Sequence, residues 1–317
     1  MDLYRKKAEE LLTAVNSVIL GKEEFTAQIL AALLAGGHIL LEDVPGVGKT
    51  TLAMAFSRAI GLEWRRVQFT PDIMPSDLTG FSVYRKEQES FVYQPGAVFC
   101  NILLADEINR TSPKTQSALL EVMEEHQVTV DGKTRKVPRP FHVIAIQNPL
   151  DTAGTQPLPE AQVDRFMVSL SLGYPDFEDE VRLIEGKGGK NRKIAPVMNG
   201  KTFLAMQKAV SEVYLHEEVG RYLVRLVSAT RNHELLAVGG SPRASIDLAK
   251  MAKATAWLNG EDFVAPQDVR RLFVDVLKHR VFVSGAARHQ RIQSREILEK
   301  IANTIPEPMH RKIGHRF

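Results

Sequence analysis

The chain of 317 residues contains a single cysteine, Cys100. One cysteine cannot form an internal disulfide, which excludes the small disulfide-stapled secreted domains and predicts a reduced, cytoplasmic protein. Long apolar runs are also missing. The most apolar segment, residues 27–41, is interrupted by polar residues and glycine, and it is shorter than the ~18 residues that a membrane span needs. The first ten residues mix both charge signs, unlike a signal peptide, so we expect no membrane span and no leader.

Neither sign of charge is in large excess, since the chain has 41 Lys and Arg and 38 Asp and Glu. A net charge of +3 is too weak to predict nucleic acid binding by itself. The excess is uneven, because residues 278–317 hold nine basic and three acidic side chains. Such a run is usually a solvated helical face, with an acidic partner or nucleic acid as the alternatives. The length and 44% apolar content predict an ordinary globular protein of two domains.

Five short apolar runs, separated by helix-length segments, occur in the first 175 residues. Unbroken apolar runs of this length are typical of strands that are buried on both faces of a parallel sheet. The sequence therefore predicts an α/β core, in which helices cover a five-stranded parallel sheet. The predicted strands are 38–41, 66–69, 101–105, 141–146 and 166–170.

Residues 70–98 interrupt this alternation, because prolines and glycines divide them. Within them, segments 81–84 and 91–93 alternate in polarity and flank a charged turn, which predicts a β-hairpin inserted into the core. A second hairpin is predicted over 128–137, where Asp131-Gly132 is a strong signal for a tight turn.

The glycine-rich, basic segment 186–193 has no large apolar residue and indicates a flexible connection. Helical patterns dominate after it, among them a helix with Ser241 as N-cap and Pro242 in its first turn. We therefore expect a core domain over residues 1–185, with the hairpin insert at about 70–98, and a helical domain over residues 186–317.

The strongest local signal is the glycine-rich segment LLEDVPGVGKTT at 40–51, which follows a predicted strand and precedes a helical run. Backbone N–H groups of such a loop encircle phosphate oxygens, and the following helix adds its positive N-terminus. Lys49 would reach the β- and γ-phosphates, and the Thr50 hydroxyl would bind Mg²⁺. Asp43 stands where the full pattern has glycine, but two loop glycines still allow close approach. The predicted nucleotide-binding residues are Pro45, Gly46, Val47, Gly48, Lys49, Thr50 and Thr51.

Polar side chains end the next two buried strands. Asp106 can bind Mg²⁺, and Glu107 can polarise a water for attack on the γ-phosphate. Asn148 can hydrogen-bond the γ-phosphate or the attacking water, although a turn asparagine before proline is common. Acidic pairs at strand ends are often helix caps, but the phosphate loop upstream favours the catalytic interpretation.

Arg165 and Arg243 are candidates for stabilising charge on the transferred phosphoryl oxygens. Arg165 from a neighbouring subunit would couple hydrolysis to assembly. Arg243 lies near a helix start in the second domain and could close that domain over the nucleotide. From the sequence alone, salt-bridge roles explain both arginines equally well.

Taken in order, the motifs resemble the MoxR family of AAA+ ATPases over nearly the whole chain, from about residue 10 to 310. The runs around Asp106 and Arg165 are specific to that branch, and the family often has aspartate at the position of Asp43. The resemblance rests on PGVGKT at 45–50, FTPD at 69–72, LADEINR at 104–110, QSALLE at 116–121, QNP at 147–149, PLPEAQVDRF at 157–166 and SPR at 241–243.

The resemblance implies a five-stranded AAA+ core with a helical lid, and ATP and Mg²⁺ as cofactors. It implies contact of residues 18–21 with adenine, which adds Gly21 to the predicted site. The two hairpins match the helix-2 insert and the pre-sensor-1 hairpin of this branch, which are thought to contact partners at the ring pore. The implied roles are Walker A for 45–51, Walker B for Asp106 and Glu107, sensor 1 for Asn148, sensor 2 for Arg243, and trans-acting arginine finger for Arg165, with Arg110 as the alternative.

The function that the resemblance implies is an ATP-driven chaperone or assembly motor. It would form a ring, a hexamer by expectation, and remodel a client protein with a von Willebrand factor A domain partner. A nucleic-acid motor is the alternative, favoured by the basic residues 278–317 and the basic tip of the second hairpin. Residues 70–98 oppose it, since they hold four acidic and two basic side chains. A nucleotide-gated binding module with little turnover is the third possibility, and intact Lys49, Asp106 and Glu107 argue against it.

Overall fold

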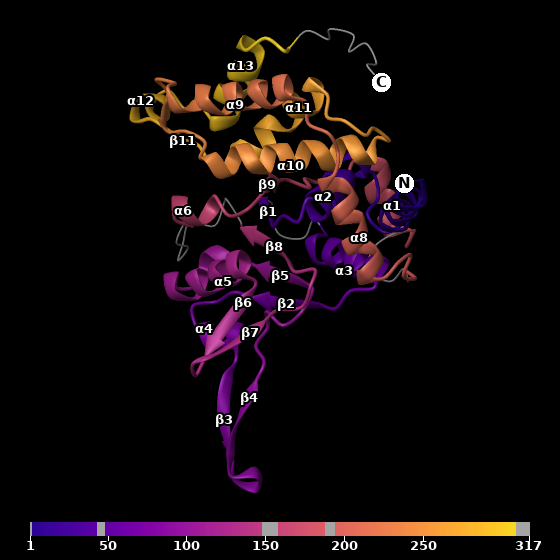
Figure 1. The fold of residues 1–317 in the computed structure, drawn as a ribbon, viewed down its shortest axis with the longest axis vertical. Helices are drawn as coiled ribbons and strands as arrows, with labels where there is room; N and C mark the ends of the chain where they lie inside the picture. The colour runs from indigo at the N-terminus through magenta and orange to yellow at the C-terminus, as the bar shows by residue number, and fades with distance from the viewer. Residues whose placement is uncertain (1, 43–47, 148–157, 188–193, 309–317) are drawn as a thin grey trace. The chain divides into compact units, whose positions relative to one another are not determined.

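The computed structural model describes residues 2–42, 48–147, 158–187 and 194–308. It contains the predicted five-stranded sheet, whose strands are all parallel and lie in the order β2, β5, β8, β1, β9 (Figure 1). The predicted α/β core is therefore confirmed. The strands are β1 (Ile39–Glu42), β2 (Trp64–Gln68), β5 (Ile102–Asp106), β8 (His142–Gln147) and β9 (Val168–Leu170).

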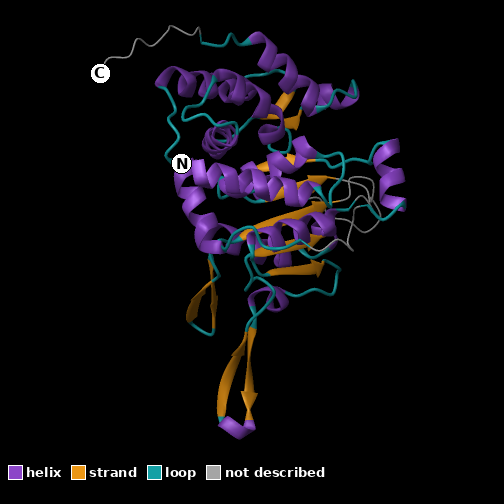
Figure 2. Ribbon diagram, turned by 90° about the vertical axis from the view of Figure 1, so that its right-hand side faces the viewer, coloured by secondary structure: helices purple, strands orange, loops and turns teal. Residues whose placement is uncertain are grey.

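Burial explains why these runs form the sheet. The apolar residues of β1, β5 and β8 are inaccessible to water, as expected of central strands covered on both faces, whereas the edge strand β2 is partly exposed. Helices surround the sheet (Figure 2), and α1 packs against both α2 and α3. Helices α1 and α2 were not predicted from the sequence. Apart from the short α4, described below, the helices before residue 188 are α1 (Asp2–Asn16), α2 (Glu23–Leu34), α3 (Lys49–Ile60), α5 (Pro113–Glu125), α6 (Glu160–Val163) and α7 (Phe177–Ile184).

Both predicted hairpins are present, each as a separate two-stranded antiparallel sheet. The first follows the short helix α4 (Pro75–Thr79) and extends away from the five-stranded sheet (Figure 1). The turn of the second, Asp131-Gly132, has positive φ at both residues, as its tight-turn signal predicts. The elements are β3 (Phe81–Arg85), the 3₁₀ turn η1 (Lys86–Gln88) and β4 (Ser90–Gln94), then β6 (Gln127–Val130) and β7 (Lys133–Lys136).

The two hairpins contact each other through Arg135 and Tyr93. The Arg135 guanidinium lies 3.8 Å from the centre of the Tyr93 ring, which is a cation–π contact. It also donates hydrogen bonds to the carbonyls of Val130 and Lys133, at 3.1 and 2.9 Å. The Tyr93 hydroxyl donates to the carbonyl of Thr79 at the end of α4. Arg135 therefore links the turn of the second hairpin to Tyr93, near the base of the first.

The chain divides into two compact units, residues 1–209 and 210–317. The second unit is mainly helical as predicted, and the Ser241 hydroxyl caps α10 by accepting from the backbone N–H of Ala244. Its core includes the fully buried Trp257, Tyr222 and Phe273. Helix α8 (Gly200–Ser211) crosses the division, and then come α9 (Glu217–Arg231), α10 (Pro242–Leu258), α11 (Pro266–Leu277), α12 (Gly285–His289) and α13 (Ser294–Thr304).

A two-stranded sheet in the second unit was not expected from the sequence. It pairs β10 (Leu236–Val238) with β11 (Phe282–Val283) in antiparallel orientation. The compact units divide at residue 209, and this division does not test whether the two domains meet near residue 185. That boundary therefore remains a proposal.

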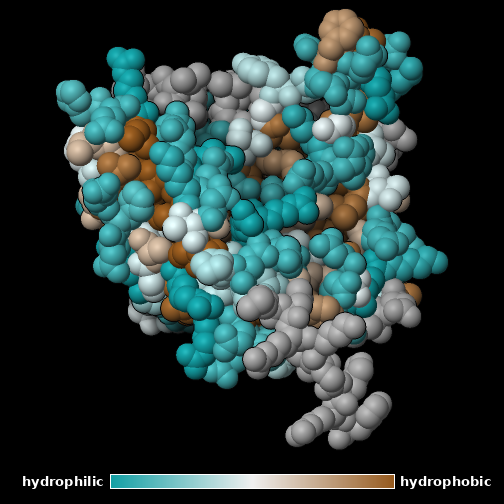
Figure 3. All heavy atoms as spheres, turned by 90° about the horizontal axis from the view of Figure 1, so that it is seen from above, coloured by the Kyte–Doolittle hydropathy of each residue, from teal (hydrophilic) through white to brown (hydrophobic). Residues whose placement is uncertain are grey.

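The surface in Figure 3 is largely hydrophilic, and apolar side chains occur there in small, separate patches. Among the helices in the described ranges, none combines the length and the apolarity that crossing a bilayer requires.

Candidate active site

Asp106 and Glu107 lie at the carboxyl end of the parallel sheet, Asp106 as the last residue of β5 and Glu107 directly after it. The register pairs Glu42 of β1 with Gln147 of β8, and Gln68 of β2 with Asp106 of β5. Ligands of open α/β sheets bind at this carboxyl edge. Strand β8, after which Asn148 follows in the chain, lies between β1, which precedes the phosphate loop in sequence, and β5, which ends in Asp106.

The N-terminus of α3 suits an anion. Gly48, directly before it, has φ of +101°, a left-handed conformation that favours glycine. No described side chain caps the helix, and its first turn has no acidic residue, so its N–H groups and positive dipole end are suited to phosphate. Lys49 is buried in the first turn, next to Thr50, and Thr51 is buried as well. Asp43, Pro45, Gly46 and Val47 lie outside the described residues.

Asp106 ends β5 at the position predicted for a Mg²⁺ ligand. Its Oδ2 accepts a hydrogen bond from Arg66 Nη2 at 2.6 Å, and the same nitrogen donates to Gln68 Oε1 at 3.0 Å. The Asp106 side chain is 14% exposed, against 45% for Arg66. Mg²⁺ prefers oxygen ligands, and it is commonly held by one or two carboxylates together with phosphate oxygens. A carboxylate at the edge where α3 offers a phosphate site therefore fits Mg²⁺ bound with a nucleotide.

Glu107 follows Asp106 with φ of +55° and ψ of 48°, at the start of the 3₁₀ turn η2 (Ile108–Arg110). This left-handed backbone costs a residue other than glycine about 1–3 kcal/mol, and residues in such conformations cluster at active sites. Its Oε2 accepts a hydrogen bond from Arg110 Nη1 at 3.1 Å. Each of the two neighbouring carboxylates therefore contacts an arginine of its own subunit.

Glu42 is a site residue that sequence reasoning missed. Its Oε1 accepts from Gln147 Nε2 at 2.8 Å, and its Oε2 accepts from the Ser169 hydroxyl at 2.6 Å. The carboxylate thus links the ends of β1, β8 and β9. An acidic residue at the end of a buried strand, directly before the glycine-rich loop, was the signal that could have identified it. Asn148 lies outside the described residues, but Glu42 fixes Gln147 immediately before it.

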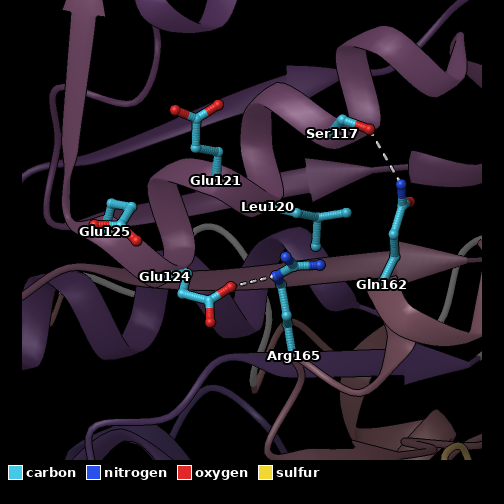
Figure 4. A pocket seen from close by; sticks show the side chains of 7 residues that line it. All are labelled: Ser117, Leu120, Glu121, Glu124, Glu125, Gln162 and Arg165. Atoms are coloured by element: carbon cyan, nitrogen blue, oxygen red, sulfur yellow. Dashed lines mark hydrogen bonds and ion pairs between the residues drawn. The ribbon is translucent and has the colours of Figure 1, made fainter.

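Arg165 lines an open cavity of about 320 Å³ on the α5 side of the core (Figure 4). Its Nε donates to Glu124 Oε2 at 2.9 Å, and its Nη1 donates to the carbonyl of Ala161 at 3.1 Å. Across the cavity, Gln162 Nε2 donates to the Ser117 hydroxyl at 3.2 Å. Leu120, Glu121 and Glu125 complete the lining. Glu124 and the Ala161 carbonyl therefore hold Arg165, whose side chain is 27% exposed, against an acidic surface.

The two remaining predicted site residues, Gly21 and Arg243, lie in different units of the chain. Gly21 has φ of +64°, and a Cβ built on it would lie 1.6 Å from Asp179 Oδ2, so only glycine fits there. Next to it, Lys22 Nζ donates to the carbonyl of Tyr174 at 2.8 Å, which ties residues 21–22 to the start of the α7 segment. Arg243 belongs to the second unit, where it lies in the first turn of α10.

Comparisons with known proteins agree with this architecture. Residues 38–168 match the ATPase family associated with various cellular activities (AAA), and residues 228–301 match the AAA lid domain. The chain is 39% identical to chaperone MoxR1 of Mycobacterium tuberculosis, over 95% of this chain and 82% of that protein. It is 46% identical to YeaC of Bacillus subtilis, an uncharacterized protein, over 94% and 93% of the two chains.

Among solved structures, a protein from Cytophaga hutchinsonii with 37% sequence identity superimposes with a TM-score of 0.90, covering 97% of this chain and 96% of its own. At 39% identity over 95% of this chain, the similarity to chaperone MoxR1 extends through both the core and the lid. The chain belongs to the MoxR family of AAA+ ATPases.

Proposed function

We propose that the protein hydrolyses ATP and uses the energy to remodel or activate a client protein. The observation that carries the proposal is the common sheet edge at which the α3 N-terminus, with Lys49 and Thr50, and the Asp106–Glu107 pair are found. In this proposal Lys49 binds the β- and γ-phosphates, and the Walker A residues surround them.

Mg²⁺ binding and the activation of water are assigned to side chains with oxygen atoms. Thr50 and Asp106 hold the Mg²⁺, which when bound neutralises charge on the phosphate oxygens. Glu107 orients a water for in-line attack and accepts its proton. Glu107 must leave Arg110 for this, and the 42% exposure of the arginine side chain allows water to replace the lost contact.

The other assignments follow the family pattern. Asn148 would act as sensor 1, Arg243 as sensor 2, and Gly21 would lie against adenine. Arg165 would act as a finger in the site of the neighbouring subunit of a ring, for which we propose six subunits. Arg165 pairs with Glu124 and not with the Glu107 of its own subunit, which supports this assignment, whereas Arg110 bonds the Glu107 of its own subunit.

For the client, we propose contact through the β3–β4 hairpin. Tyr84 and Phe91 lie opposite each other in register, with ring centres 5.4 Å apart, and they are 50% and 74% exposed. Exposed aromatic pairs of this kind suit protein partners. A von Willebrand factor A domain protein is the proposed second partner, by family pattern alone.

The nucleic-acid alternative has less support. One of the three basic residues of the second hairpin, Arg135, is engaged with Tyr93 and two carbonyls, although Lys133 and Lys136 are exposed. Phosphate-gripping surfaces need several available cations. Fluorescence anisotropy with single- and double-stranded DNA at low salt decides this point, and salt-sensitive binding would favour the alternative.

Steady-state phosphate release tests the catalytic proposal. We expect Glu107→Gln to lower turnover by about 100-fold or more while nucleotide binding persists, since it removes the general base. Lys49→Ala is expected to weaken nucleotide binding itself. Glu10→Gln, an exposed change on α1, serves as the matched carboxylate control and should turn over normally. Equal rates in all four proteins would refute hydrolysis at this site and leave a binding module.

A further inference from the structure

The ion pair between Arg66 and Asp106 follows from the pairing of β2 with β5. Arg66 lies opposite Leu104, and Gln68 lies opposite Asp106, so all four side chains project from the same face of the sheet. Arg66 reaches diagonally to Asp106, a separation that long side chains can span. The 2.6 Å distance between Nη2 and Oδ2 is that of a strong charge-assisted hydrogen bond.

This contact places a fixed positive charge at the carboxylate assigned to Mg²⁺. The Asp106 side chain is 14% exposed, so water screens its interactions less than at an open surface. A divalent cation at Asp106 would therefore meet repulsion from the guanidinium. Arg66 has another partner available, because the same Nη2 also donates to Gln68 Oε1 at 3.0 Å. Arg66 can therefore release Asp106 and keep its hydrogen bond to Gln68, which lowers the free energy needed to break the ion pair.

We propose that Arg66 competes with Mg²⁺ for Asp106, and that it thereby sets the Mg²⁺ concentration at which the site binds its metal–nucleotide complex. The inference rests on the proposed function, in which Asp106 is a Mg²⁺ ligand. Arg66 acts through Asp106 and is thus a positioning residue. The ion pair keeps the carboxylate neutralised until the cation arrives together with the nucleotide phosphates.

The test measures metal affinity directly, without turnover. Mn²⁺ replaces Mg²⁺, and its dissociation constant is measured by electron paramagnetic resonance with a saturating non-hydrolysable ATP analogue. For Arg66→Gln, removal of an ion pair of this exposure is expected to tighten Mn²⁺ binding by about threefold to fivefold. Arg66→Lys keeps the charge and should remain near the natural affinity.

The neighbouring Arg65 provides the matched control. It lies on the opposite face of β2 and pairs with Glu63 at 3.1 Å, so Arg65→Gln removes the same charge from the same strand without touching Asp106. Its Mn²⁺ affinity should equal that of the natural protein. Thermal unfolding of each variant checks that the fold is intact.

Each result has one meaning. Tighter Mn²⁺ binding in Arg66→Gln alone supports the competition. Unchanged or weaker binding overturns it, and weaker binding would mean that Arg66 holds Asp106 in place for the metal. Equal tightening in Arg65→Gln would also overturn it, because the effect would then be general charge removal. If the natural protein binds neither the analogue nor Mn²⁺, the proposed function itself fails.

Discussion

At the scale of single residues, two buried histidines tie the sheet to its helices. His38 Nε2 donates to the carbonyl of Met123 at 3.1 Å, and its Nδ1 accepts from the N–H of Val143 at 2.9 Å. His142 Nδ1 donates to the carbonyl of Gly37 at 2.9 Å, and its Nε2 accepts from Gln207 at 3.2 Å. Both rings are therefore neutral with a fixed tautomer, and a second proton on either ring would break a bond.

These histidines predict acid sensitivity. Burial lowers the pKa of His38 to about 3 and the pKa of His142 to about 4, from 6.5 in the unfolded chain. Below pH 6.5 the unfolded chain binds protons that the folded protein excludes, so stability falls as pH falls. Between pH 6.5 and its lowered pKa, each histidine decreases the free energy of unfolding by about 1.4 kcal/mol for every unit that the pH falls.

Urea unfolding at pH 7 and pH 5 measures this effect. His142→Asn should be less stable at pH 7, because it loses packing, but it should lose less of its remaining stability at pH 5 than the natural protein does. An equal loss in the two proteins would show that other groups cause the acid sensitivity.

At the scale of elements, the sequence predicted most of the sheet and both hairpins because the relevant signals are local. Apolar runs identified the central strands β1, β5 and β8, and Asp131-Gly132 identified a turn. The pair of β10 and β11 was missed because strands of three and two residues carry no measurable period. The contacts of Asp106 with Arg66 and of Glu42 with Ser169 also escaped, since they depend on strand order and register.

The β3–β4 hairpin carries the prediction that belongs to this scale. Phe91→Ser should change the unfolding free energy by no more than about 0.5 kcal/mol, because the side chain is 74% exposed. Basal ATP hydrolysis should persist. The Glu107→Gln variant should retain ATP and its bound partners. Adding Phe91→Ser to it is expected to reduce the amount of client protein that co-purifies from the source cell, compared with Glu107→Gln alone.

The control for the hairpin is Phe177→Ser, which removes an aromatic ring that is 78% exposed on α7. It should leave recovery unchanged if the hairpin is the contact. Equal recovery with and without Phe91 would contradict a client role for this surface.

At the scale of the whole molecule, the uneven charge distribution suits contacts between neighbouring subunits of the proposed ring. The chain up to residue 277 has a small acidic excess, whereas residues 278–317 are basic. If these surfaces meet between neighbouring subunits, assembly should weaken as salt rises, because exposed charges are screened within about 10 Å at 0.1 M ionic strength. Sedimentation across a salt series measures this, and assembly that is insensitive to salt would count against the contact.

We propose that the active site is composite, with Glu107 from one subunit and Arg165 from its neighbour. Arg165→Ala should bind ATP and fail to hydrolyse it, and Glu107→Gln should behave alike. When the two variants are mixed, some sites combine an intact Glu107 with an intact Arg165, so we expect phosphate release to reappear. A mixture that co-assembles but stays as inactive as its components, or Arg165→Ala that hydrolyses ATP at the natural rate, would contradict it.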